Sequence, residues 1–199
     1  NFKLQINKKL KSDINIYFSD IGIDIGTDYN NEELLEIKVI LGQTICGLFC
    51  LDKNGIYITK HRGLYYPFNI WVVSIISTLF DKFYITKPLT SRIYNSEIYI
   101  IGIGYKGYEY SKKILDDLFR LLYNFNKKTA YYFGTTDIDI IQSIYKAISY
   151  INNVQINALL ACSDDYKNNV NKQNIISNNK ELQEKFIIDF NFKIFNNIL

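Results

Sequence analysis

Short apolar runs alternate with helix-length segments over the first 123 residues of the chain. Strands are predicted at residues 14–18, 56–58, 83–85 and 96–103. Helices are predicted at residues 31–51, 69–80 and 108–123. This alternation is typical of an open α/β sheet with helices on both faces. The loop between the last two strands is too short for a crossover helix, so these strands should form an antiparallel hairpin at the sheet edge.

The remainder of the chain has a different character. Helical spacing continues over residues 137–150 and 151–160, an Asn-rich loop follows at 167–180, and residues 181–199 carry one apolar helical face. We therefore expect two parts, a sheet domain over residues 1–126 and a helical extension with an Asn-rich loop over residues 127–199.

Composition narrows the classes of protein that are possible. Of the 199 residues 48% are hydrophobic, which excludes a disordered chain. No apolar run reaches the roughly 20 residues of a membrane helix, so no membrane partner is expected. The three cysteines are read as reduced thiols of a cytosol-like compartment, and Cys46 and Cys50 are expected to be buried. Because the chain has no methionine and begins at Asn1, we expect it to be a fragment of a longer protein.

Several motifs suggest sites that the rest of the sequence does not support. The glycines at 102, 104 and 107 match a dinucleotide fingerprint, but no second parallel strand ending in an acid follows, so a strand end and a turn are expected there. The aspartates at 20, 24 and 28 lack the spacing of a calcium loop. Cys46 and Cys50 share a helix face, yet His61 is the single histidine, so no zinc site can be assembled and no metal is expected.

The loop before the last strand carries an unusual concentration of polar groups between two apolar strands. Residues 87–99 read K-P-L-T-S-R-I-Y-N-S-E-I-Y. This segment resembles the last sheet hairpin of the FtsJ-like (RrmJ-like) RNA ribose 2′-O-methyltransferases, especially the cap-specific enzymes of animals and of large DNA viruses of the African swine fever virus type. Their hairpin carries the pattern K-P-x-x-S-R-x-x-N-S-E-x-Y.

The resemblance extends upstream in the same order over about residues 14–105. Residues 18–22 (F-S-D-I-G) resemble the family's D-G-G segment, and Gly42-Gln43 lies in the helix that follows. Residues 55–60 (G-I-Y-I-T-K) resemble the strand that ends in a catalytic lysine, and Pro67-Phe68 matches a P-F before the next helix. The family likeness thus implies a Rossmann-like methyltransferase sheet, of which this chain carries the C-terminal part.

The resemblance also implies the chemistry of the site. The family uses a Lys-Asp-Lys-Glu tetrad, three of whose members correspond to Asp20, Lys60 and Glu97. Its cofactor is S-adenosylmethionine, which would contact Asp20, Ile21 and Gly22, with the glycine-rich loop expected upstream of this chain. The substrate would be capped mRNA, contacted through four residues of the hairpin loop: Lys87, Ser91, Arg92 and Asn95. A cytoplasmic location, in a viral factory or a virion, follows from the same likeness.

Two departures from the family pattern leave alternatives open. Ile21 stands where the family usually has Gly, and the tetrad's first lysine has no counterpart. Without that cation, the two carboxylates would keep Lys60 protonated, so we expect the 199 residues alone to be inactive. The protein could be part of an active enzyme whose N-terminal half or partner subunit completes the sheet, a catalytically inactive subunit that stabilises a capping partner, or an RNA-binding module.

Overall fold

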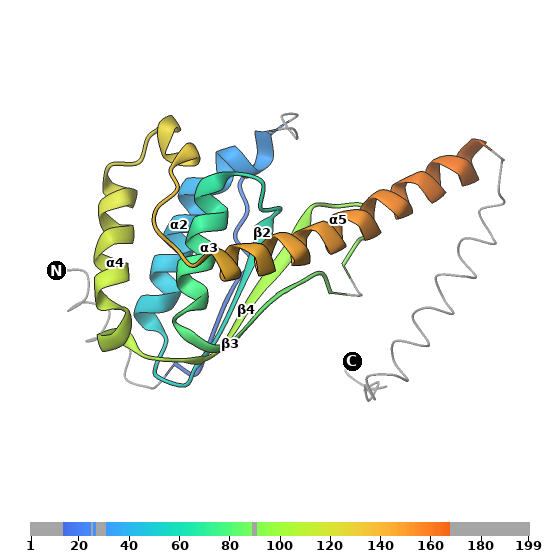
Figure 1. Ribbon diagram of the computed structural model, residues 1–199. Helices are drawn as coiled ribbons and strands as arrows, with labels where there is room; N and C mark the ends of the chain where they lie inside the picture. Colours follow the sequence, from blue (N-terminus) through green and yellow to red (C-terminus); the bar gives the residue numbers. More distant parts are fainter. Residues whose placement is uncertain (1–13, 25, 27–30, 89–90, 168–199) are drawn as a thin grey trace, which may run out of the picture. The chain divides into compact units, whose positions relative to one another are not determined.

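The computed structural model describes residues 14–24, 26, 31–88 and 91–167 (Figure 1). The strands are β1 (Ile16–Ser19), β2 (Ile56–Arg62), β3 (Phe80–Thr86) and β4 (Glu97–Tyr105). The helices are α2 (Glu32–Cys50), α3 (Pro67–Ser77), α4 (Tyr108–Tyr123), the short 3₁₀ helix η2 (Lys127–Tyr131) and α5 (Ile138–Lys167). The described residues fall into two units, one within residues 1–88 and 96–152 and the other within 89–95 and 153–199.

The four strands form one mixed sheet in the order β1-β2-β4-β3. Strand β1 pairs in parallel with β2, whereas β4 pairs antiparallel with both β2 and β3. The predicted antiparallel hairpin of the last two strands is confirmed, and so is the α/β class. The hairpin folds back so that β4, rather than β3, lies beside β2.

One face of the sheet is covered by α2, α3 and α4 (Figure 1). Tyr57 of β2 and Ile100 of β4 are fully buried on this face, together with apolar side chains from all three helices: Ile37, Leu41, Leu48, Phe68, Val73, Ile76, Leu115 and Leu118. Each such side chain contributes about 2 kcal/mol by leaving water, so this layer holds the sheet in register.

The opposite face presents apolar side chains to solvent among the described residues. Ile16 and Phe18 of β1 are 61% and 59% exposed, and Tyr84 and Ile103 are also exposed. Successive side chains of a strand point to opposite faces of the sheet. The register that buries Tyr57 on one face therefore places these four apolar side chains on the other. The second layer of helices expected from the sequence is not supplied by α2, α3 or α4.

The structure corrects several boundaries and one burial prediction. Helix α3 begins at Pro67, and β3 already begins at Phe80, because Thr78 and Leu79 form the turn between them. The two helices predicted over 137–160 are one continuous helix, α5. Cys46 is exposed instead of buried, although all three cysteines are free as expected. Residues 168–199, including most of the predicted Asn-rich loop and the amphipathic tail, lie outside the described residues.

The glycine motif at 102–107 has the expected simple explanation. Gly102 and Gly104 belong to β4, and Gly107 is the N-cap residue of α4. Gly104 has a φ of +75°, and a Cβ there would lie 2.4 Å from Asp81 Oδ2, so both backbone conformation and space require glycine. The motif therefore turns the chain from β4 into α4.

Candidate active site

The strand arrangement brings the three residues expected to be catalytic to one edge of the sheet. Asp20 follows the end of β1, and Lys60 lies near the end of the parallel strand β2. Strand β4 runs in the opposite direction, so its first residue, Glu97, pairs with Arg62 at the same edge. Asp20 and Glu97, 77 positions apart in the sequence, thus share the carboxyl edge of β1 and β2 with Lys60, where open α/β sheets bind their ligands.

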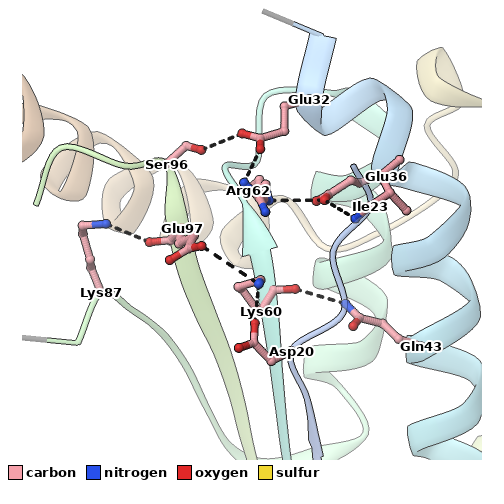
Figure 2. Close-up of polar contacts among 10 residues, drawn as sticks. All are labelled: Asp20, Ile23, Glu32, Glu36, Gln43, Lys60, Arg62, Lys87, Ser96 and Glu97. Atoms are coloured by element: carbon pink, nitrogen blue, oxygen red, sulfur yellow. Dashed lines mark hydrogen bonds and ion pairs between the residues drawn. The ribbon is translucent and has the colours of Figure 1, made fainter. Parts of the chain in front are cut away.

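Lys60 is held between the two carboxylates (Figure 2). Its ammonium forms an ion pair with Asp20 and lies 4.0 Å from Glu97 Oε1. The Lys60 side chain is 9% exposed, whereas Asp20 is 48% exposed. The lysine is therefore shielded from water while the aspartate keeps one side open toward solvent, as a ligand would require.

Gln43 of α2 fixes the relative position of the two strand ends. Its side-chain N–H donates to the backbone carbonyl of Lys60 at 3.1 Å, and its side-chain oxygen accepts from the Ser19 hydroxyl at 2.9 Å. Its own carbonyl accepts from the Tyr17 hydroxyl at 3.0 Å. Gln43 is buried, and both the oxygen and the nitrogen of its side-chain amide are hydrogen-bonded. It therefore joins β1 to β2 directly beside Asp20 and Lys60.

A second cation, Arg62, lies next to the lysine. Its guanidinium forms an ion pair with Glu32, and its Nε lies 3.2 Å from Glu36 Oε1. A Cβ built on Gly22 would lie 3.2 Å from Arg62 Nη2 and 3.9 Å from Lys60 Nζ, so both cations border the same point. Arg62 was not among the predicted site residues, although a residue two positions after Lys60 on a strand must share its face.

Glu36 ties the loop after Asp20 to this cluster. Its Oε1 accepts the backbone N–H of Ile23 at 3.2 Å. Burial raises the pKa of Glu36, an effect that the Ile23 N–H and the Arg62 charge oppose. Glu32 and Glu36 lie four residues apart on one helical face, a spacing that could have indicated a shared partner.

The predicted RNA-contacting residues fall in both units. Lys87 donates to the backbone carbonyl of Glu97 at 3.0 Å, and burial lowers the pKa of Lys87. Ser91, Arg92 and Asn95 belong to the second unit, in which the Asn95 N–H donates to the Arg92 carbonyl at 3.3 Å. Arg92 is exposed.

His61 lies between Lys60 and Arg62 but faces the core. It is 1% exposed, its Nε2 lies 3.2 Å from the Thr59 hydroxyl oxygen, and burial lowers its pKa to about 4. Within the part of the chain that the structure describes, no three His, Cys, Asp or Glu residues are grouped as a metal site would need. None of the described helices is long and apolar enough to cross a membrane.

Comparison with known proteins assigns the family. The FtsJ-like methyltransferase family matches residues 1–105, just over half of the chain. A relative from African swine fever virus named Probable methyltransferase EP424R is 42% identical over 102 residues, which cover 51% of this chain and 24% of the relative. The Xenopus laevis cap-specific mRNA (nucleoside-2′-O-)-methyltransferase 1 is 29% identical over 115 residues, or 58% of this chain and 13% of the relative.

This chain belongs to the FtsJ-like methyltransferase family. An uncharacterised protein, L511, of Acanthamoeba polyphaga mimivirus is 32% identical over 157 residues, which cover 77% of this chain and 19% of that protein. A ribosomal RNA methyltransferase crystal structure from Plasmodium falciparum aligns at 20% identity with a TM-score of 0.42, covering 54% of this chain and 56% of the other. The chain spans at most about a quarter of the length of the curated relatives named above.

Proposed function

We propose that this chain is the C-terminal part of a methyltransferase that transfers the methyl group of S-adenosylmethionine to a ribose 2′-hydroxyl of capped mRNA. The observation that carries the proposal is the position of Lys60, a nearly buried ammonium between Asp20 and Glu97 at the carboxyl edge of the parallel strands. A structural ion pair needs one carboxylate, whereas a lysine that exchanges a proton with a bound hydroxyl needs a shielded, oriented position.

The chemistry assigns each of the three residues a role. A ribose hydroxyl is a poor nucleophile and must lose its proton as it attacks. The tetrad's first lysine, supplied from outside this chain, would favour the neutral form of Lys60, which accepts that proton on Nζ. Asp20 and Glu97 orient the amine and stabilise the ammonium that results. Bound S-adenosylmethionine would supply an electrophilic methyl carbon.

The residues present fit the cationic end of that cofactor. Four carboxylates (Asp20, Glu32, Glu36 and Glu97) surround two cations, Lys60 and Arg62. The excess of carboxylate favours a ligand that carries positive charge, such as a sulfonium with an adjacent ammonium. Asp20, Ile21 and Gly22 would hold that end of the cofactor, because Asp20 and Ile21 are exposed directly after β1.

Capped mRNA is proposed as the substrate because two relatives, from Xenopus laevis and Trypanosoma brucei, are named cap-specific mRNA (nucleoside-2′-O-)-methyltransferases. Lys87, Ser91, Arg92 and Asn95 would contact the RNA backbone. We further propose that residues 1–126 belong to the methyltransferase domain, that 127–199 form an extension, and that a segment or subunit outside this chain supplies the glycine-rich loop. A cytoplasmic site of action is proposed because of the likeness to the African swine fever virus relative.

Methyl transfer by the full-length protein tests the proposal. The protein would be incubated with radiolabelled S-adenosylmethionine and RNA that carries either a methylated cap or a 5′-triphosphate. We expect label on the capped RNA, in a nuclease-resistant dinucleotide that marks a 2′-O-methyl group. Transfer to a base, or equal transfer to both RNAs, would contradict the assigned reaction. Binding of a capping enzyme without any transfer would favour an inactive subunit instead.

A further inference from the structure

Four exposed aromatic residues and a half-buried one form a group that the proposed catalytic residues do not use. We call it the aromatic patch: Tyr65, Tyr66, Tyr131, Tyr132 and Phe133. Tyr131 is 67% exposed and Phe133 47% exposed, and both follow the family's matched segment, which ends at residue 105. Large rings held in water are costly unless a ligand covers them.

The backbone on both sides of residues 131–133 is fixed. Before them, the Asn126 side chain accepts the Lys128 N–H at 2.9 Å, and the Thr129 hydroxyl accepts the Asn126 N–H at 3.1 Å. Thr129 and Ala130 are buried. The exposed rings therefore project from an ordered turn, which reduces the entropy lost when a ligand binds.

Trp71 fixes the backbone that follows residues 131–133. Trp71 Nε1 donates to the Thr135 carbonyl at 3.4 Å, and its ring contacts that of Tyr132 edge-on at 5.0 Å. A Cβ on Gly134 would lie 2.7 Å from the Trp71 ring, so only glycine permits this approach. Tyr66 meets Tyr131 edge-on at 5.8 Å, which joins the two halves of the patch.

The patch lies at the end of the sheet that carries the candidate active site. Tyr65 and Tyr66 follow β2 directly, and Glu33 of α2 accepts both of their backbone N–H groups, at 2.9 and 3.1 Å. The 3₁₀ helix η2 packs against α3, whose first turn follows Tyr66, and Figure 1 shows η2 and the start of α3 at the same end of the molecule. A substrate strand that reaches Lys60 would pass close to this end.

Charge identifies the kind of ligand. Lys128, whose side chain is exposed, lies three residues before Tyr131 in the same 3₁₀ helix η2. Exposed rings beside cations are the combination by which proteins bind single-stranded nucleic acid, with bases stacked on the rings and phosphates near the cations.

We propose that the aromatic patch binds unpaired bases of the substrate RNA, next to the nucleotide that is methylated. This inference rests on the proposed function, since it assumes that an RNA strand reaches the carboxyl edge of the sheet. It adds a stacking site that lies outside the family's matched segment.

Affinity for a fluorescent single-stranded RNA, measured in the full-length protein, tests the inference. We expect the double variant Tyr131→Ala, Phe133→Ala to bind at least about tenfold more weakly, because each stacked base contributes strongly to affinity. The conservative variant Tyr131→Phe should bind like the wild type. Tyr110→Ala is the matched control, since Tyr110 is 61% exposed, has Lys106 over its ring, and lies on the α4 turn that follows the other end of β4.

Salt dependence separates stacking from charge. The Ala double variant should lose affinity equally at all salt concentrations, whereas Lys128→Ala should reduce the slope of log affinity against log salt by about one. An unchanged affinity in the double variant would overturn the inference and leave a protein contact as the use of the patch.

Crosslinking of 4-thiouridine RNA to the wild-type protein needs no variant and guards against misfolding. Adducts on residues 131–133 are expected, and adducts found only elsewhere would contradict the stacking site. If the protein binds RNA through the patch but transfers no methyl group, the proposed function fails, whereas the stacking of unpaired bases on the patch stands. If methyl transfer occurs and the double variant binds RNA like the wild type, the proposed function stands and the stacking site is wrong.

Discussion

The side-chain N–H of Gln43 donates to the backbone carbonyl of Lys60 across 3.1 Å, so helix α2 holds the strand end that presents the lysine. The same amide accepts from Ser19, the residue before Asp20. A single helical residue therefore sets the spacing between the lysine and its nearest carboxylate (Figure 2).

Replacing Gln43 should slow the reaction while substrate binding is retained. In Gln43→Leu the Ser19 hydroxyl and the Lys60 carbonyl lose their buried partner, and displacement of the lysine should lower kcat by tenfold or more, with little change in KM for RNA. Gln142→Leu on an exposed position of α5 is the control. A rise in KM together with a fall in kcat and in the melting temperature would indicate a merely structural role for Gln43.

Arg92 should contribute a phosphate contact. Arg92→Ala should weaken RNA binding and reduce the salt slope by about one, because one fewer counterion is released on binding. Lys53→Ala removes an exposed charge from the turn before β2, at the strand end opposite Lys60, and should leave both quantities unchanged. Equal slopes for Arg92→Ala and the wild type would remove Arg92 from the RNA path.

Buried His61 should make the fold sensitive to acid. Its pKa is about 6.5 in an unfolded chain and is lowered by burial to about 4 in the folded one. Between these pH values the unfolded state binds a proton that the folded state does not. The free energy of unfolding should therefore fall by about 1 kcal/mol for each unit that the pH drops below 6.5, until about pH 4.

Urea denaturation at several pH values measures this contribution. His61→Phe should remove its part of the slope, whereas Thr59→Val deletes the hydrogen bond to His61 but keeps the imidazole and should retain the slope. Identical pH dependence in His61→Phe and the wild type would mean that the pKa of His61 is the same in the folded and the unfolded state.

The exposed sheet face should make the 199-residue chain associate when it is produced alone. Phe18 and Ile103 lie on that face, and β1 pairs only with β2 among the described strands, which leaves an edge open to other chains. Sedimentation should detect oligomers, and Phe18→Ser with Ile103→Thr should reduce them. Tyr123→Ser, at a 91% exposed position of α4, should not. A soluble monomer that binds S-adenosylmethionine at micromolar concentration would contradict this expectation.

The elements that repeat a regular pattern could be predicted from the sequence. Alternating Ile14, Ile16 and Phe18 indicated β1, and the spacing of apolar residues indicated α2 and α4 to within a few residues. The short loop between β3 and β4 required a hairpin, and this connection brings Glu97 to the edge that carries Lys60.

Other features depend on tertiary contacts that no local pattern encodes. The carboxylate of Glu33 in α2 accepts the Tyr65 and Tyr66 N–H groups and the Asn69 side-chain amide, which fixes the start of α3. Gln43 and Glu36 resemble ordinary polar positions of an amphipathic helix. Their partners, Lys60 and Arg62, are supplied by a strand about 20 residues away.

The rate of methyl transfer by Lys60→Met in the full-length protein tests the central claim most directly. Methionine nearly preserves the volume of the buried side chain but cannot accept a proton. With saturating S-adenosylmethionine and capped RNA in a single turnover, the rate should fall at least about 100-fold, while RNA affinity and melting temperature stay close to those of the wild type. Retention of more than about a tenth of the wild-type rate would contradict the assignment of Lys60 as the group that takes the ribose proton.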